Sequence, residues 1–220
     1  MQKVLFDWED DFFRPSSLPA WLPDETLYSL CCRYHFLSGN RLASITSSQL
    51  FGSATAGLRH DFPSRLNHFI AVSRGAWGSV DELIQQGTVL PFYHPFISPE
   101  ISDQVVDKMR GESVAYAKYL LGLPASRIGA AHPLKSCPVC RERDKAVDGV
   151  AYWHRNHQLP SVWACLQHGV LLQQAEVKTN LVGRLQWLLP ELVPYMLISV
   201  QKCTRSLRDL RVEVHHPRSC

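Results

Sequence analysis

Apolar residues between positions 24 and 38 recur three or four places apart. This spacing puts their side chains on one face of a helix, and a glycine after the last turn is typical of a helix end. We therefore predict a helix that is capped by Asp24 and stopped at Gly39. Its buried face should hold Leu27, Leu30, Cys31, Tyr34 and Leu37.

A second helix is predicted over residues 41–51, which Gly52 follows. Two helices around a short glycine turn are compatible with a helix-turn-helix motif. Arg41 is the only cation that the second helix offers, and docking on phosphate usually needs more positive charge. Contact with protein, or plain core packing, fits at least as well as DNA reading. The apolar positions of this helix are Leu42, Ile45 and Leu50.

Further helices are predicted from apolar spacing and from start signals. They are a helix with Leu66, Phe69, Ile70 and Val72, a helix from the capping box Ser79-x-x-Glu82 to Gly87, a helix that starts at Ser98-Pro99, and a segment over 112–121. Residues 88–96 are rich in proline and aromatic residues, and we predict an extended belt there.

Composition adds little to this pattern. Of the 220 residues, 45% are apolar and 20% charged, as in an ordinary soluble globular protein. The N-terminus lacks the pattern of a secretory signal, no apolar run is long enough to cross a bilayer, and the cysteines number seven. We expect a cytoplasmic protein without a membrane partner.

Charge divides the chain unevenly. Residues 1–126 carry 10 Lys and Arg against 13 Asp and Glu, a net −3, and residues 127–220 carry 13 against 7, a net +6. Nucleic acid, if bound, is expected at the second part, and a solvated basic surface explains the charge equally well. The residues predicted to contact nucleic acid or a partner are Arg141, Arg143, Lys145 and Arg155, together with Arg59 and Arg65 in the first half.

The strongest chemical signal is a pair of short motifs, Cys137-x2-Cys140 and Cys165-x2-His168, with 24 residues between them. Two such pairs can converge on one tetrahedral ion with three thiolates and one imidazole, a set that suits Zn²⁺. Four protein ligands close the site to the water that catalytic zinc usually binds. We predict one structural zinc ion held by these four residues.

Two alternatives to this ligand set stay open. His154 or His157 is within range to replace His168, and Cys137 with Cys140 can be a redox pair or simply buried thiols. Between the ligand pairs, residues 141–145 are predicted to be a charged loop tip, 150–153 a strand and 159–163 its return, which is the order of a zinc ribbon.

The predicted fold class is mainly α with a small β zinc ribbon. An extended arm, 1–23, precedes a helical, helix-turn-helix-like region, 24–130, and a Cys3His module, 131–173. A basic amphipathic helix is predicted in the tail, 174–220, because apolar residues from Leu192 to Leu207 recur beside four cations.

No catalytic motif is present. The chain lacks a phosphate-binding loop, a serine nucleophile elbow and a His-Glu-x-x-His sequence, and its acids are not paired for two metals. We therefore predict that the protein is not an enzyme; a zinc enzyme would need an open coordination position.

An ordered set of motifs resembles the TniQ/TnsD family of transposition target selectors. The set consists of Leu22-Pro23-Asp24-Glu25-Thr26-Leu27-Tyr28-Ser29-Leu30, Leu90-Pro91-Phe92-Tyr93-x-Pro95-Phe96, Cys137-Pro-x-Cys140, Trp153-x-Arg155-x-His157-Gln158-Leu159-Pro160 and Cys165-x2-His168-Gly169. The resemblance runs from about Leu22 to Leu172, and it implies the same four metal ligands, Cys137, Cys140, Cys165 and His168.

The resemblance also implies a function. It implies a bacterial, non-catalytic adaptor that binds target DNA or a CRISPR effector complex and recruits an AAA+ ATPase, which activates a transposase. Larger members of the family continue past the zinc ribbon into further DNA-binding or dimerising domains. Target-DNA specificity that lies in such a domain is expected to be missing from this chain. We therefore expect docking of the ATPase before DNA reading. Whether the protein forms a homodimer is left open. The alternative function is a standalone zinc-ribbon DNA-binding regulator.

Overall fold

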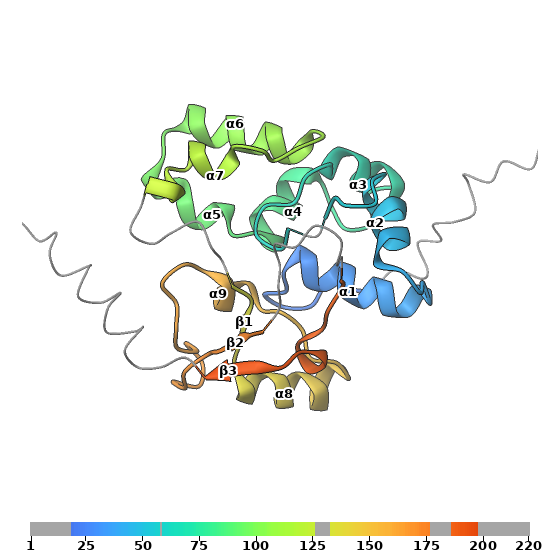
Figure 1. Ribbon diagram of the computed structural model, residues 1–220, viewed down its shortest axis with the longest axis vertical. Helices are drawn as coiled ribbons and strands as arrows, with labels where there is room; N and C mark the ends of the chain where they lie inside the picture. Colours follow the sequence, from blue (N-terminus) through green and yellow to red (C-terminus); the bar gives the residue numbers. More distant parts are fainter. Residues whose placement is uncertain (1–18, 58, 126–132, 177–185, 198–220) are drawn as a thin grey trace, which may run out of the picture.

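The computed structural model describes residues 19–57, 59–125, 133–176 and 186–197. Figure 1 shows α2 to α7 in the upper part of the molecule, α8, α9 and the sheet in the lower part, and α1 between them. The α-helices are α1 (Leu27–Ser38), α2 (Ala43–Phe51), α3 (Leu66–Val72), α4 (Val80–Gly87), α5 (Leu90–Tyr93), α6 (Pro99–Arg110), α7 (Ala117–Leu120), α8 (Pro138–Asp148) and α9 (Arg155–Gln158). The 3-10 helices are η2 (His94–Phe96), η3 (Leu123–Ala125) and η4 (Pro190–Leu192).

The predicted helix pair forms, and glycine ends both helices. Gly39 follows α1 with φ 70° and Gly52 follows α2 with φ 63°, a left-handed conformation that costs glycine little. The cap prediction was wrong, because the Thr26 side chain caps α1 and Asp24 lies before it. Three residues predicted to be buried, Leu37, Leu42 and Ile45, are exposed by 67%, 60% and 43%.

The start signals of α4 and α6 were interpreted correctly, and α3 forms where the apolar spacing predicted a helix. Ser79 and Glu82 make both hydrogen bonds of a capping box at α4, and Ser98 caps α6 with Pro99 in the first turn. The segment predicted over 112–121 is helical only from Ala117 to Leu120. Apolar side chains of α1, α2, α3, α4 and α6 fill one core, which includes Leu30, Leu50, Phe69, Leu83 and Met109.

We expect the replacement of Ser79 by alanine to lower the free energy of unfolding by about 1 kcal/mol. The Ser79 hydroxyl accepts from the Glu82 N–H at 3.2 Å, and the Ser79 N–H donates to the Glu82 carboxylate at 2.7 Å. Urea unfolding measures the difference. Ser102→Ala, inside α6, is the control and should change stability by less than about 0.5 kcal/mol. Equal losses in both variants would contradict a role for the cap.

The prediction of an extended belt over residues 88–96 was wrong. This stretch forms α5 and η2, each with a proline in its first turn. A proline there removes no helical hydrogen bond, because the first N–H groups of a helix have no partner within it. The two prolines therefore start short helices, and Leu90 and Tyr93 join the core.

The sheet is small and antiparallel. Its order is β1 (Lys135–Ser136), β2 (Gln173–Ala175) and β3 (Tyr195–Leu197), and Gln174 pairs with both Lys135 and Met196. Mainly helical structure with a small sheet confirms the predicted fold class, but the strands are not those predicted. Residues 150–153 are irregular, and the predicted loop tip, residues 141–145, lies in helix α8, which Pro138 begins and Gly149 ends.

The C-terminal prediction was wrong over the part that the structure describes. Residues 190–197 form η4 and strand β3, not an amphipathic helix. The rest of the predicted tail helix and the N-terminal arm up to residue 18 lie outside the described residues. Within the described segments, none of the helices combines the length and the apolar character needed to cross a membrane.

The helical region shares its core with part of the metal-binding module, including Trp153, whereas Cys137, Cys140, Cys165 and Leu172 form a second, smaller cluster. The Thr26 N–H donates to the Trp153 carbonyl at 3.0 Å, and the Trp153 N–H donates to the Ser29 hydroxyl at 3.0 Å. Trp153 is fully buried, and its indole N–H donates to the Leu188 carbonyl at 2.7 Å. Three stretches far apart in sequence therefore meet at one tryptophan.

Candidate metal centre

Two turns bring the four predicted ligands together. Cys137 precedes helix α8 and Cys140 lies in its first turn, while Cys165 and His168 lie in a tight turn that Gly169 closes with φ 64°. The Gly169 N–H donates to the Cys165 carbonyl at 2.8 Å, and the Cys165 N–H to the Val170 carbonyl at 2.8 Å. Backbone hydrogen bonds thus fix the second ligand pair.

The four ligand atoms face one another. They all lie within 4.8 Å, three of the four residues are buried, and His168 is partly exposed. His168 Nδ1 lies 3.6 Å from Cys137 Sγ, 3.4 Å from Cys140 Sγ and 3.5 Å from Cys165 Sγ. Cys140 Sγ lies 3.7 Å from Cys165 Sγ. Four soft to borderline donors at such separations can hold a metal ion.

Electrostatics favours a cation at this place. Burial and the neighbouring Cys137 and Cys165 sulfurs raise the pKa of Cys140 far above that of a free thiol. Burial also opposes ionisation of Cys165, yet its pKa is lowered because the backbone N–H groups of His168 and Gln167 donate to its sulfur. Neighbouring thiolates repel one another unless a metal ion neutralises them.

The structure decides between the three candidate histidines. His168 belongs to the cluster, whereas His154 Nε2 is 2.7 Å from Asp144 Oδ2 in a buried pair. His157 Nε2 lies 3.8 Å from Cys140 Sγ, and burial lowers the pKa of His157 to about 3, so its imidazole is neutral. In the Nε2–H tautomer it donates to that sulfur and orients it, as partners of metal ligands commonly do.

A buried lysine holds the stretch between the two ligand pairs in place beside the metal centre. Lys135 Nζ donates to the Leu159 carbonyl at 2.9 Å and the Val162 carbonyl at 2.6 Å, and it lies 4.7 Å from the centre of the Trp163 ring. The sequence analysis did not single out Lys135 or the Asp144–His154 pair. No spacing rule reveals them, because their partners lie 10 to 27 positions away.

The four cations of the second half that were predicted to contact nucleic acid or a partner each have a partner of their own within the chain. Arg141 donates to Gln173 at 2.6 Å and lies over the Tyr195 ring. Arg143 pairs with Asp144 at 3.0 Å, and Lys145 lies 3.7 Å from Glu191. Arg155 is on α9, where it donates to the Gln85 carbonyl at 2.5 Å. Arg143 and Lys145 remain the more exposed pair, with side chains 42% and 41% accessible.

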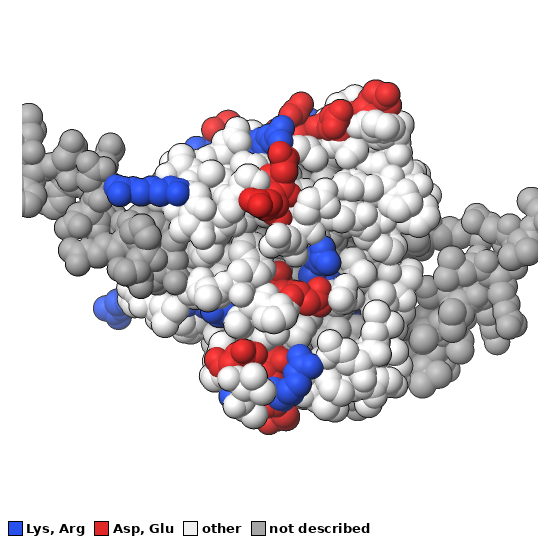
Figure 2. Space-filling model, turned by 180° about the vertical axis from the view of Figure 1, so that it is seen from behind, with Lys and Arg blue, Asp and Glu red and all other residues white. Residues whose placement is uncertain are grey.

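The other two predicted cations lie in the helical region. Arg59 is exposed, whereas Arg65 pairs with Glu112 and donates to the Phe51 carbonyl. Figure 2 shows acidic groups gathered on the end of the molecule that carries α6, and both signs of charge mixed on the end that carries α8. The face in Figure 2 therefore presents no continuous basic surface.

Comparison with known proteins agrees with the motif order. The model of the TniQ family matches residues 17–172, more than half of the chain. The chain belongs to the TniQ family. The metal cluster lies inside the matched range, as do α1 to α9. This membership confirms the resemblance that the sequence motifs indicated.

A curated relative is similar over most of this TniQ chain. The transposon Tn7 transposition protein TnsD of Escherichia coli is 27% identical over 160 residues, which cover 71% of this chain. The match spans only 31% of the length of TnsD. The similarity therefore concerns one part of that longer protein.

Proposed function

We propose that this TniQ chain is a non-catalytic adaptor for transposon target selection. In this proposal it recruits an AAA+ ATPase to target DNA or to a CRISPR effector complex in the bacterial cytoplasm. The observation that carries the proposal is the family match over residues 17–172, within which the four metal-ligating residues converge. The relative named as a transposition protein supports the same role.

We propose that the metal is one Zn²⁺ ion with a structural role. Tetrahedral zinc with bonds of about 2.3 Å to sulfur and about 2.0–2.1 Å to nitrogen requires sulfur–sulfur separations of about 3.8 Å and sulfur–nitrogen separations of about 3.5 Å. Here Cys140 Sγ lies 3.7 Å from Cys165 Sγ, and His168 Nδ1 lies 3.4 to 3.6 Å from the three sulfurs. Three thiolates and one imidazole complete the coordination of the ion, which leaves no place for a reacting water.

In this adaptor, the zinc-bound module and the helical region act as one rigid body. The hydrogen bonds between Thr26, Ser29 and Trp153 support this view, because they join the two parts through buried groups. A rigid body presents its surface to a partner without a large loss of conformational entropy on binding.

A reconstitution with purified components tests the adaptor proposal. The probes are an AAA+ transposition ATPase of the TnsC kind and double-stranded DNA, and the readout is retention of the ATPase on DNA by the chain in biolayer interferometry. We expect retention to depend on the chain. Salt-dependent DNA binding without retention of the ATPase would favour the standalone regulator and overturn the adaptor.

Contact with nucleic acid or with a partner protein is proposed for Arg59, Arg65, Arg141, Arg143, Lys145 and Arg155, and we propose DNA contact first for Arg143 and Lys145. Arg143 and Lys145 need the smallest rearrangement, because both lie on α8 and their side chains are partly exposed. The double replacement of Arg143 and Lys145 by alanine should weaken binding and reduce the slope of log K against log salt by about 2, since each phosphate that the protein neutralises adds about 0.9 to that slope.

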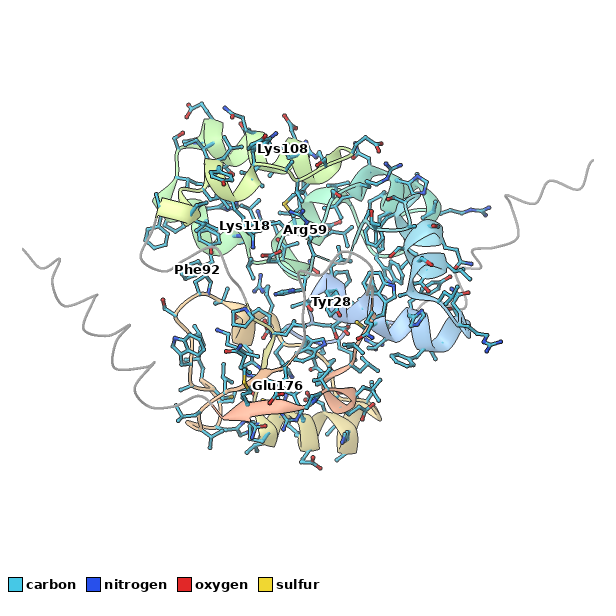
Figure 3. The ribbon with its side chains drawn as sticks, viewed as in Figure 1. Tyr28, Arg59, Phe92, Lys108, Lys118 and Glu176 are labelled. Carbon is cyan, nitrogen blue, oxygen red and sulfur yellow. The ribbon has the colours of Figure 1, made fainter. Side chains whose placement is uncertain are left out.

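A matched control for this variant lies at the far end of the molecule. Lys108 on α6 is labelled near the top of Figure 3, and Arg110 is its neighbour on the same helix. Replacing both by alanine removes the same charge. An equal reduction of the salt slope in both double variants would show that only net charge matters and would contradict a contact at α8.

A further inference from the structure

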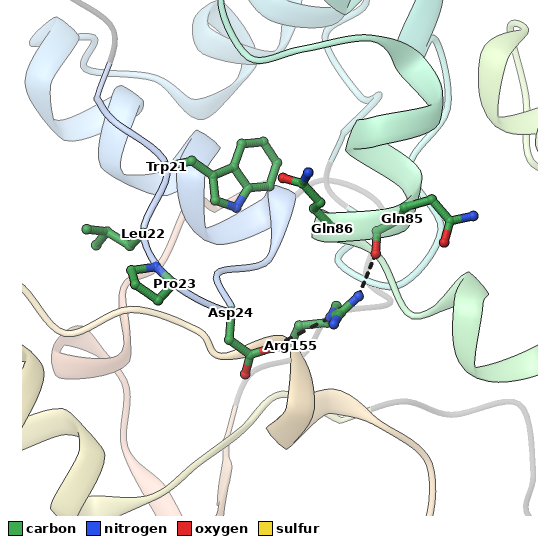
Figure 4. A pocket seen from close by; sticks show the side chains of 7 residues that line it. All are labelled: Trp21, Leu22, Pro23, Asp24, Gln85, Gln86 and Arg155. Atoms are coloured by element: carbon green, nitrogen blue, oxygen red, sulfur yellow. Dashed lines mark hydrogen bonds and ion pairs between the residues drawn. The ribbon is translucent and has the colours of Figure 1, made fainter.

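A pocket of about 420 Å³ opens where three separate stretches meet. These are residues 21–24, the last turn of α4 and the start of α9 (Figure 4). The lining residues are Trp21, Leu22, Pro23, Asp24, Gln85, Gln86 and Arg155. The volume is in the range of sites that bind small ligands or a few side chains. The metal centre and the proposed DNA contacts on α8 lie outside it.

The walls of the pocket are held in place before any ligand arrives. Asp24 has φ 58°, unusual for a residue other than glycine, and hydrogen bonds and an ion pair with α9 hold it there. Its carbonyl accepts from the Arg155 N–H at 2.6 Å, its carboxylate accepts from the Asn156 N–H at 3.1 Å, and Arg155 Nε lies 3.6 Å from the same carboxylate.

The tryptophan wall is equally fixed. Trp21 packs so closely on Gly87 that a Cβ at position 87 would lie 2.8 Å from the indole. The preceding and following residues are tied as well, since Arg33 donates to the Ala20 carbonyl at 2.9 Å and the Leu22 N–H donates to the buried Glu25 carboxylate at 3.1 Å. A pre-formed pocket loses little conformational freedom when it binds.

The side chains of the pocket have complementary chemistry on its two sides. Trp21, Leu22 and Pro23 supply apolar surface, and Figure 4 shows the Gln86 amide reaching toward the Trp21 ring. Among the described residues, the exposed Gln86 amide has no hydrogen-bond partner, so it offers both a donor and an acceptor. An apolar wall that faces a free amide suits an apolar side chain attached to a peptide group.

Charge argues against an anionic ligand such as nucleic acid. The one cation of the pocket, Arg155, already has the Asp24 carboxylate at 3.6 Å and the Gln85 carbonyl at 2.5 Å (Figure 4). Helix α4 ends here, and the C-terminal end of a helix presents carbonyl groups and partial negative charge. Phosphate would therefore meet a carboxylate and a helix C-terminus, whereas an uncharged peptide meets no unfavourable charge.

We propose that this pocket binds an apolar side chain of an extended, uncharged peptide segment from a partner protein, with the peptide backbone hydrogen-bonded to the Gln86 amide. The inference goes beyond the adaptor role, because it names a site and the chemistry of its occupant. It does not depend on the partner being an ATPase. The pocket proposal and the adaptor proposal can therefore be contradicted independently of each other.

Selection from a phage-displayed library of random 12-residue peptides tests the pocket. The purified full chain is compared with Gln86→Trp, which fills the pocket, and with Gln104→Trp, an exposed position on α6 outside it. We expect enrichment of peptides with an apolar anchor and few acidic residues. A synthetic peptide of the enriched sequence should bind the chain and Gln104→Trp equally, and Gln86→Trp at least tenfold more weakly.

A milder variant separates loss of the site from loss of the fold. Gln86→Ala removes only the amide, and it should weaken the same peptide at least threefold while circular dichroism and metal content stay unchanged. The proposal is overturned if no peptide is enriched, or if the enriched peptide binds all variants equally. It is also overturned if a 12-nucleotide single strand, and not a peptide, binds in a manner that Gln86→Trp abolishes.

Discussion

Replacing Cys137 with serine is expected to reduce bound metal from one ion per chain to none and to unfold the metal-binding module. A structural zinc ion contributes about 10–16 kcal/mol in small zinc-binding peptides, which is as large as the net stability of about 5–15 kcal/mol of a typical domain. Cys137 is fully buried, so its loss leaves three ligands and a gap in the coordination. Elemental analysis and circular dichroism measure the two effects.

The loss should spread beyond the module. Leu134, Trp153 and Ala175 belong to the same core as the helices of the N-terminal region. We therefore expect one cooperative transition at lower temperature, not a separate melting of the module. Full metal content in the Cys137→Ser chain would show that the ligand assignment is wrong.

Cys31→Ala is the matched control for the cysteine variant. Cys31 is also fully buried, and burial raises the pKa of its thiol, but it lies on α1 outside the metal cluster. The Cys31→Ala chain should keep one metal ion and lose only the packing of a small side chain. Metal loss in this control as well would mean that any core defect releases the ion.

Replacing Trp153 with alanine is expected to cost about 3–5 kcal/mol of unfolding free energy. The indole is fully buried and packs between the helical region and the metal-binding module, so its removal leaves a large cavity in the shared core. It also leaves the Leu188 carbonyl without the indole N–H that donates to it at 2.7 Å. Urea or thermal unfolding of the metal-loaded chain measures the loss.

An exposed aromatic residue provides the comparison for Trp153. Phe36 on α1 is 48% exposed, and Phe36→Ala should change the unfolding free energy by less than about 0.5 kcal/mol. A cost for Trp153→Ala of less than about 1 kcal/mol would contradict the view that the two parts are joined through this side chain. The loss of unfolding free energy in Trp153→Phe should fall between those of Phe36→Ala and Trp153→Ala. The phenylalanine keeps an aromatic ring but loses the hydrogen bond of the indole N–H.

The sequence by itself indicated the four residues that converge in the candidate metal cluster, both ends of α4, the ends of α1 and α2, and the start of α6. Cysteine and histidine two residues apart can converge only through a tight turn, and this local constraint does not depend on the rest of the fold. The same holds for the capping box at Ser79 and the glycine stops at positions 39 and 52, because each acts within one turn of its own helix.

Short apolar stretches were the places where prediction from sequence was weakest. Residues 150–153 look like a strand, yet they lie irregularly against α1, since partners for their backbone come from Thr26 and Ser29. Residues 195–197 look helical, yet they complete the sheet beside β2. A short segment takes the structure that satisfies its hydrogen bonds, and those partners are distant in the sequence.

Only the tertiary structure decided what the charged residues do. From the sequence, Arg141 and Arg155 were expected to be free cations. In the fold, Arg141 contacts the Tyr195 ring and Gln173. Arg155 contacts the Asp24 carboxylate and the Gln85 carbonyl. Asp24 itself looked like a helix cap and instead closes a pocket with α9. Local spacing fixes which residues can turn or bind a metal, whereas the partner of a long charged side chain depends on which distant stretch the core brings beside it.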